Sequence, residues 1–325
     1  MGGNALKNIE TRRYELAEFK RIESFVHSKL YTKVFAHDTI PYYHTKDSFG
    51  DLDIIYTNYK YSPLKREDIV KLFNPDEIYV NGTVISFNVE QLQVDLIYSD
   101  YMEYDYALKY FSWNDCGNLI GKLCHKFGLK HGHRGLTYPL RDGDNMFAEV
   151  QVTSSYEETL NFLGLDPLKH HEGFDTLEDM FKFIASSKYF NPKFFAFEEM
   201  NHIARIRDKK RSTYNAFLKF CETWDGPVWE PKVTNKADYL PMLFREFNQM
   251  ESKFNTEVRN LAFQKYVKQK FNGHIVSELT GLTDKELGGF MKHIRQYPEL
   301  SPEMVAYRSE EDIASIVLDL FKAYQ

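Results

Sequence analysis

The feature that most constrains the fold of this chain is the position at which strand-forming sequence stops. Runs rich in β-branched and aromatic residues recur up to about residue 153, whereas only helical spacing of apolar residues is found from about Gly173 to the end. A sheet must therefore come from the N-terminal half. We predict an α+β fold, with a mixed sheet and flanking helices over residues 1–172 and an all-helical domain over residues 173–325.

Changes of period divide the N-terminal half into helices and strands. Helical spacing predicts a long helix from about Glu10 to Tyr31, and it returns over 101–127 with a break at 112–115, where Asn114 or Asp115 can cap a second helix. An Asp142-Gly143 turn and a Ser155–Glu158 capping box follow. Strands are expected at 34–37, around 51–56, and at 77–80, 84–89, 91–98, 136–140 and 146–153. Later helices are expected near 176–186, 195–224, 239–270, 275–295 and 310–323.

Composition limits the kinds of partner and the cellular location. The 325 residues carry a net charge of −6, so the whole surface is not that of a non-specific nucleic-acid binder, and any such contact must be local. Three cysteines without CxxC spacing argue against a disulfide framework and for a reducing compartment. The sequence has neither a hydrophobic leader nor a membrane-spanning run. We expect a cytoplasmic protein without a membrane partner.

Three aspartates in strand-forming runs indicate chemistry. Asp51 and Asp53 are two residues apart, so both carboxylates lie on one face of a strand while Leu52 points away. Asp95 repeats this setting in the run Leu92–Tyr98, and we expect a neighbouring strand to bring it beside the first two. Three carboxylates on one face repel each other unless a cation lies among them, and Mg²⁺ prefers oxygen ligands. The three acids are therefore the predicted ligands of a metal-dependent enzyme.

The same acids carry a family resemblance. The string Thr45–Ile54, followed some forty residues later by Val94–Ile97 on a separate strand, resembles the catalytic core of the DNA polymerase β-like nucleotidyltransferase superfamily. The resemblance implies that Asp51, Asp53 and Asp95 are catalytic and hold two Mg²⁺ ions between a nucleoside triphosphate, such as ATP, and an acceptor hydroxyl. It also implies transfer of a nucleoside monophosphate with release of pyrophosphate, by the two-metal logic of phosphoryl transfer.

The chain departs from this family upstream of the acids. Where the family usually has a Gly-Ser or Gly-Gly turn against the triphosphate, this sequence has Asp38–Pro41. Phosphate contacts are therefore expected from other residues near the acids and from the helix after Asp95, where two polar residues at i and i+4 share one face. The predicted nucleotide-binding residues are Thr45, Lys46, Ser48, Asn118 and Lys122.

Two segments of the helical half suggest an RNA acceptor. Residues 271–291 resemble the segment after the palm in bacterial-type CCA-adding enzymes and poly(A) polymerases, with a Thr283–Glu286 capping box in place of the usual Pro-Gly turn. A basic run late in a predicted helix provides cations along which a polynucleotide can lie. The predicted nucleic-acid-binding residues are Arg205, Arg207, Lys209, Lys210 and Arg211. The resemblance thus favours an RNA 3′ end, such as that of tRNA, as acceptor.

Three alternatives stay open from the sequence. The same palm is compatible with transfer to a small molecule or protein, or with synthesis of a signalling nucleotide. A repair polymerase of the DNA polymerase β type would instead require a template. The replaced Gly-Ser turn also permits a binding module for nucleotide or RNA that has kept the fold without catalysis.

Overall fold

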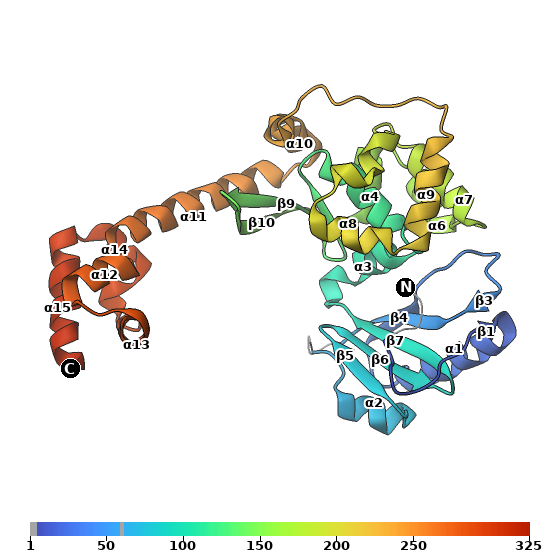
Figure 1. Cartoon of the computed structure of the whole chain (residues 1–325), viewed down its shortest axis with the longest axis horizontal. Coiled ribbons are helices and arrows are strands. Elements are labelled where there is room, and N and C mark those ends of the chain that lie inside the picture. Colours follow the sequence, from blue (N-terminus) through green and yellow to red (C-terminus); the bar gives the residue numbers. More distant parts are fainter. Residues whose placement is uncertain (1–4, 59–61) are drawn as a thin grey trace. The chain divides into compact units, whose positions relative to one another are not determined.

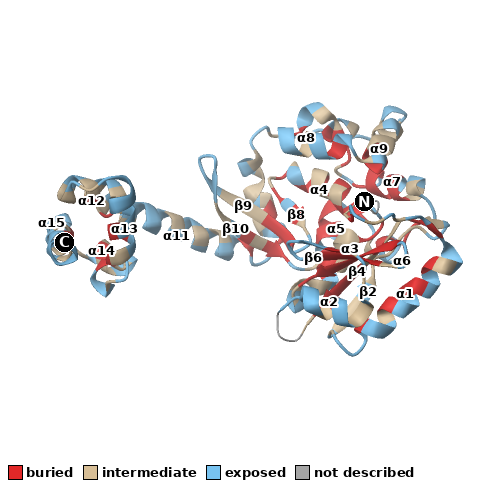
Figure 2. Cartoon of the chain, turned by 60° about the horizontal axis from the view of Figure 1, so that its bottom comes forward, coloured by how far each residue is buried: buried red, intermediate tan, exposed pale blue. Residues whose placement is uncertain are grey.

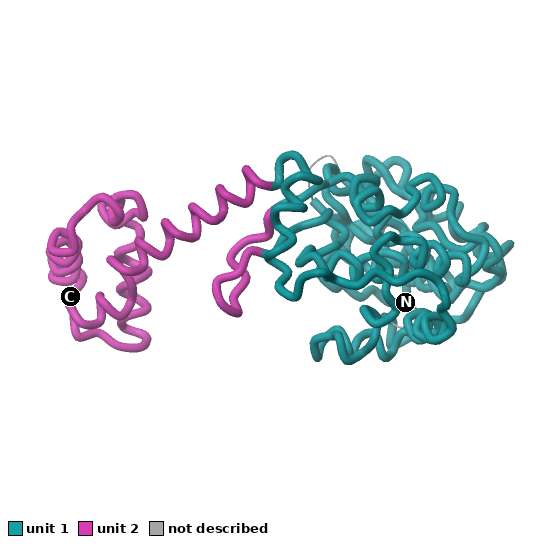
Figure 3. Tube along the Cα trace, turned by 90° about the horizontal axis from the view of Figure 1, so that it is seen from above, with its two compact units in different colours: residues 1–139, 151–250 teal, residues 140–150, 251–325 magenta. Residues whose placement is uncertain are grey.

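The computed structural model describes residues 5–58 and 62–325. Its chain forms two compact units, Met1–Pro139 with Gln151–Met250, and Leu140–Val150 with Glu251–Gln325 (Figure 3). The prediction of an α+β region with a mixed sheet, followed by an all-helical part, is confirmed. The boundary expected near residue 172 between a palm and an acceptor-binding domain stays a prediction.

A five-stranded mixed sheet is the centre of the N-terminal region (Figure 1). Its order is β2-β4-β7-β6-β5, in which β4 and β7 are parallel and the other neighbours are antiparallel. Strands β4, β7 and β6 each pair with a neighbouring strand on both edges. The strands are β2 (Ala36–Thr39), β4 (Asp51–Thr57), β5 (Ile78–Asn81), β6 (Val84–Val89) and β7 (Leu92–Tyr98).

One face of this sheet packs on helix α1 (Leu16–Leu30), which presents Phe19, Ile22 and Val26 at helical spacing. Figure 2 shows buried residues along α1 and the strands. Each such apolar side chain stabilises the fold by about 1.5–3 kcal/mol. Helix α2 (Arg66–Phe73) adds Ile69 to the same core.

The start of the first helix differs from the prediction. Helix α1 begins at Leu16 rather than near Glu10, because Tyr14–Glu15 form strand β1 and pair with β3 (Ser48–Phe49). Strand pairing with a distant segment therefore overrides the local helical pattern before Leu16.

The predicted helix break at 112–115 is confirmed. A short 3₁₀ turn (Tyr101–Glu103) leads into α3 (Tyr104–Phe111), and α4 (Cys116–His125) follows the break. Trp113 and Asn114 have φ values of 61° and 62°, in the left-handed region. The Trp113 ring packs so closely on Gly173 that a Cβ there would lie 2.1 Å from it. Asp115 precedes α4, but its side chain makes no cap hydrogen bond and pairs with Arg211 instead.

A second, three-stranded sheet follows α4 in the order β10-β9-β8. Strands β9 (Gly135–Asp142) and β10 (Asn145–Thr153) confirm the two predicted strands and the Asp142-Gly143 turn. Strand β8 (Lys130–Gly132) was not predicted, because three residues are too few to establish a period. Ser155 caps α5 (Tyr156–Leu163) by accepting from the Glu158 N–H, which confirms one half of the predicted capping box. The other half does not form, because the Ser155 N–H donates to the Thr153 hydroxyl instead of the Glu158 carboxylate.

In the described part of the chain, no strand follows β10. Buried aromatic side chains, among them Phe127, Phe162 and Tyr214, fill the core of this helical region. After α5, the helices of the first unit are α6 (Pro167–Glu172), α7 (Leu177–Ala185), α8 (His202–Lys209), α9 (Ser212–Glu222) and α10 (Leu240–Glu246), with 3₁₀ turns at Pro192–Phe195, Phe197–Glu199 and Lys236–Tyr239.

Three predicted helices are interrupted. The segment 195–224 forms separate helices because Met200 and Arg211 are extended and Asn201 caps α8 through its side chain. The segment 239–270 breaks at Phe247, which is also extended. The segment 275–295 breaks at Gly281, whose φ of 75° ends the first helix in a left-handed cap.

The second unit has its own apolar core. Val276, Phe290, Ile294 and Val317 are buried in it. Helix α13 begins directly after Thr283, the first residue of the predicted capping box, but the Thr283 side chain makes no cap hydrogen bond. The predicted capping box is wrong because Asp284 has a left-handed φ of 47°, which a regular first turn does not have. The helices are α11 (Met250–Lys270), α12 (Gly273–Thr280), α13 (Asp284–Ile294), α14 (Pro302–Tyr307) and α15 (Glu310–Tyr324), with a 3₁₀ turn at Pro298–Leu300.

Candidate metal centre

The three predicted metal ligands meet on one face of the five-stranded sheet. Asp51 and Asp53 lie on β4, and Asp95 lies directly opposite Asp53 on the parallel strand β7. One ligand atom from each carboxylate lies within 4.8 Å of the other two. Asp51 and Asp53 are half-buried and Asp95 is buried. The sequence prediction that these acids converge is therefore confirmed.

Alternation along the two strands explains why the acids share this face. Leu52 and Ile54 on β4, and Val94 and Leu96 on β7, are fully buried in the core that contains α1. Because successive side chains of a strand point to opposite faces, burying these four residues turns the aspartates to the other side. The hydrophobic pattern thus places the acids.

The electrostatics of the triad favour binding of a cation. Burial, and then the nearby charges of Asp51 and Asp95, raise the pKa of Asp53 well above its ordinary value. Burial also raises the pKa of Asp95, although hydrogen bonds from Ser86 and Gln93 act in the opposite direction. The Oδ1 atom of Asp53 is buried without a hydrogen-bond partner. A buried carboxylate oxygen of this kind fits a hard divalent cation, which would supply both the missing partner and the missing charge.

A pocket of about 480 Å³ opens beside the acids. Asp51 and Asp53 line it from β4, and residues of α3, α4 and the start of α9 line it from the helical side. Three cationic side chains, Arg13, Lys46 and Arg211, also border it. Burial lowers the pKa of Lys46, while the charges of Asp51 and Asp53 counteract that effect. The pocket therefore combines an acidic site with cations that can bind an anionic ligand.

The five predicted nucleotide-binding residues fall into two groups. Lys46, Ser48 and Asn118 line the pocket. Thr45 instead donates its hydroxyl to the backbone oxygen of Asp175 at 2.5 Å, and Lys122 forms an ion pair of 2.8 Å with Asp208. Nucleotide binding by these residues stays a prediction.

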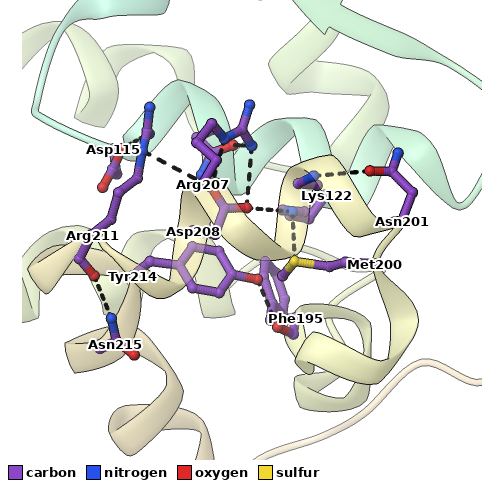
Figure 4. A network of polar contacts seen from close by, with 12 residues as sticks. Asp115, Lys122, Phe195, Met200, Asn201, Arg207, Asp208, Arg211, Tyr214 and Asn215 are labelled. Atoms are coloured by element: carbon purple, nitrogen blue, oxygen red, sulfur yellow. Dashed lines mark hydrogen bonds and ion pairs between the residues drawn. The ribbon is translucent and has the colours of Figure 1, made fainter.

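A buried carboxylate lies inside the basic run. Asp208 of α8 is fully buried, and it accepts from Arg207 at 2.7 Å and from Lys122 of α4 at 2.8 Å (Figure 4). Burial alone would raise the pKa of Asp208, but the hydrogen bonds from these two cations hold it below its ordinary value. Arg211 pairs with Asp115 and lies 3.9 Å from Asp208. The network thus connects α8 to α4.

Asn118 links this network to the pocket. Its Oδ1 accepts from Arg207 at 2.9 Å, so the NH₂ group of the same side chain must point away from that guanidinium. The Nδ2 atom is buried without a hydrogen-bond partner. Asn118 is also one of the residues that line the pocket.

The other cations of the run have different surroundings. Arg205 donates to the backbone oxygen of Met200 at 3.1 Å, and the Lys209 ammonium lies 5.5 Å from the centre of the Phe197 ring. Lys209 and Lys210 are exposed. Contact of the run with a nucleic acid stays a prediction.

Sequence reasoning missed two partners of the site. Gln93 could have been predicted from its spacing, because a residue two positions from Asp95 on the same strand lies on the same face of the sheet. Asp208 was visible as the single acid within the basic run, and its burial was not expected.

Comparison with known proteins assigns the chain to no family. No protein-family model matches the chain, and no curated protein matches it. Among the described residues, no helix combines the length and the apolar character needed to cross a bilayer. Fold and site together define an α+β protein with a candidate acidic metal centre on its sheet.

Proposed function

We propose that the protein is a Mg²⁺-dependent nucleotidyltransferase, which transfers a nucleoside monophosphate from a nucleoside triphosphate to an acceptor hydroxyl and releases pyrophosphate. The observation that carries this proposal is the convergence of Asp51, Asp53 and Asp95, whose ligand atoms lie within 4.8 Å of one another beside a pocket. That pocket, of about 480 Å³, is within the range of about 300–1,000 Å³ found for small-molecule sites.

In this proposal the three carboxylates hold the metal. The buried Oδ1 of Asp53 and the mutual repulsion of the acids both support this role. Two Mg²⁺ ions, when bound, would activate the acceptor hydroxyl and offset the negative charge of the pyrophosphate leaving group. The acids themselves set the position of the reacting groups on the sheet face.

Residues around the acids would bind the triphosphate. Lys46 supplies a cation close to Asp51 and Asp53, and Arg211 supplies another from the helical side of the pocket. Ser48 accepts from the Arg13 Nε at 2.9 Å, and its own hydroxyl hydrogen can still be donated to a phosphate oxygen. Asn118 would donate its Nδ2–H to the nucleotide. Arg13 is an addition to the residues expected from the sequence.

The proposed acceptor is the 3′ end of an RNA such as tRNA. The exposed cations Lys209 and Lys210 support this choice, since they are positioned to meet phosphates without breaking a buried ion pair. Arg207 and Arg211, which are tied to Asp208 and Asp115, would contribute mainly through their charge. Binding to RNA should weaken steeply as the salt concentration rises.

The test is a nucleotide-incorporation assay. Purified protein is incubated with Mg²⁺ and each labelled triphosphate in turn, alone, with tRNA or total RNA, and with a primed DNA template. We expect label at RNA 3′ ends for the wild type and its loss in Asp51→Asn and Asp53→Asn. Asp105→Asn is a matched control, because this exposed acid lies on α3 and pairs only at the surface with Lys109.

Each alternative gives a distinct result. Label in a small product or in the protein itself would indicate a different acceptor, and template-directed incorporation into DNA would indicate a polymerase. Incorporation that is unchanged in both acid variants would refute the catalytic role of the triad. Calorimetric binding of ATP and Mg²⁺ without incorporation into any acceptor would favour a binding module.

A further inference from the structure

The face of the sheet that carries the acids also carries buried polar side chains. Across β4, β7 and β6, Asp53 lies opposite Asp95 and Asp95 opposite Ser86, while Asp51 lies opposite Gln93. Gln93 is only 2% exposed. A buried amide next to a buried carboxylate requires hydrogen-bond partners on both of its ends.

Gln93 has partners on both ends. Its Nε2 donates to the Oδ1 and the Oδ2 of Asp95, each at 3.0 Å. Its Oε1 accepts from the backbone N–H of Ala5 at 2.9 Å, with the Leu6 N–H at 3.5 Å. Because a backbone N–H is a donor only, the oxygen of the amide must face Ala5 and the NH₂ group must face Asp95. The backbone of residue 5 thus fixes the orientation of the Gln93 amide.

The segment that contains Ala5 is itself anchored to the sheet. The Leu6 side chain is buried, and the backbone N–H groups of Lys7 and Asn8 donate to the Glu77 carboxylate at 3.1 and 2.8 Å. Further on, the Arg12 N–H donates to the Gln91 carbonyl at 3.0 Å. We call residues 5–13 the N-terminal arm. Contacts at Glu77, next to β5, and at Gln91, in the turn before β7, hold the arm against the sheet.

We propose that Gln93 is a positioning residue, which holds the Asp95 carboxylate in the orientation needed to bind a divalent cation, and that the N-terminal arm holds Gln93. This inference rests on the proposed function only in requiring that the triad binds metal. The single Nε2 group of Gln93 contacts both oxygens of Asp95, which fixes the direction of the carboxylate and leaves its other lone pairs for a cation. Outer hydrogen-bond partners of this kind commonly affect metal affinity by about 10–100-fold.

The first experiment measures Mn²⁺ binding to the full chain by calorimetry, without nucleotide. Gln93→Met keeps the length of the side chain and removes the donors, so the Kd for Mn²⁺ should rise about 10–100-fold. Gln91→Met is the matched control, because Gln91 is exposed in the adjacent turn and contacts the arm through its backbone. Its Kd should equal that of the wild type.

A second pair of variants tests the arm without changing the sheet. Ala5→Pro removes the N–H that donates to Gln93, and should weaken Mn²⁺ binding severalfold. Ala5→Ser keeps that N–H and should bind as the wild type does. Thermal unfolding of each variant without metal measures the folded fraction separately.

The outcomes distinguish the proposals. A Gln93→Met variant with an unchanged Kd, or with fewer binding sites at an unchanged Kd, would show a purely structural role and overturn the inference. A wild type that binds no Mn²⁺ would overturn both this inference and the proposed function. Mn²⁺ binding that depends on Gln93, without nucleotide incorporation, would support the inference and contradict the proposed function.

Discussion

Protons and cations compete for the carboxylate oxygens of the aspartates that share one face of the sheet. Burial and the neighbouring carboxylates raise the pKa of Asp53, so near neutral pH this side chain holds a proton that a metal ion must displace. We therefore expect cation binding at this candidate centre to depend on pH.

Metal binding should release protons and strengthen as the pH rises. The protonated carboxyl of Asp53 is a poor ligand, so for each proton displaced the Kd for Mn²⁺ should fall by about tenfold per pH unit between about pH 6 and pH 8. Calorimetry in two buffers with different ionisation enthalpies measures the number of protons released. Binding that is independent of pH and of the buffer would contradict the prediction.

At the scale of helices, the buried ion pair between α4 and α8 should contribute more to the free energy of unfolding than the surface ion pairs do. Asp208 is fully buried and Lys122 is only 14% exposed in its side chain, so neither charge can be solvated if the other is lost. A surface pair such as Glu178–Lys182 is 67% and 61% exposed and remains hydrated when broken. The contact between α4 and α8 also fixes the helix that bears Asn118.

Replacing Asp208 by Ala should lower the free energy of unfolding by about 3–5 kcal/mol, because Lys122 and Arg207 would lose their buried counter-ion. Glu178→Ala is the control, with an expected loss of at most about 1 kcal/mol. Equilibrium urea unfolding compares the two variants. Similar losses in both would argue against a special role for the buried network.

Elements with a strong local period were predictable from the sequence, and those set by distant contacts were not. Strands β6 and β7 follow from alternation, and the acids on β4 follow from their spacing. The contact of Lys122 with Asp208 joins residues 86 positions apart, and that of Ala5 with Gln93 joins residues 88 apart. No local pattern encodes such pairs, and for the same reason extended residues such as Met200 interrupted helices that the sequence suggested were continuous.

At the scale of the whole molecule, stability is divided between cores that belong to different units. The acids lie on a sheet whose core with α1 is in the first unit, whereas Ile294 and Val317 are buried within the second unit. A change in the core of the second unit should therefore leave the metal centre intact.

Ile294→Ala should destabilise the second unit by about 2–5 kcal/mol, through the lost transfer energy and the cavity that it creates. Leu318→Ala is the control, because this side chain is 36% exposed and its loss should destabilise the unit much less. Hydrogen exchange of amides in residues 271–325 measures the loss, and Mn²⁺ titration should give an unchanged Kd. Loss of Mn²⁺ binding in this variant would mean that the second unit supports the centre.

The parallel pairing of β4 with β7 also protects this sheet from misfolding. The side-chain period of a strand is two, so sliding β7 by one residue would turn Asp95 and Gln93 into the apolar core beside α1. A buried, unpaired carboxylate there would be far more costly than an exposed leucine. The polar residues of this face thus also disfavour slipped registers, so a chain with mispaired strands would not reach a comparably stable state.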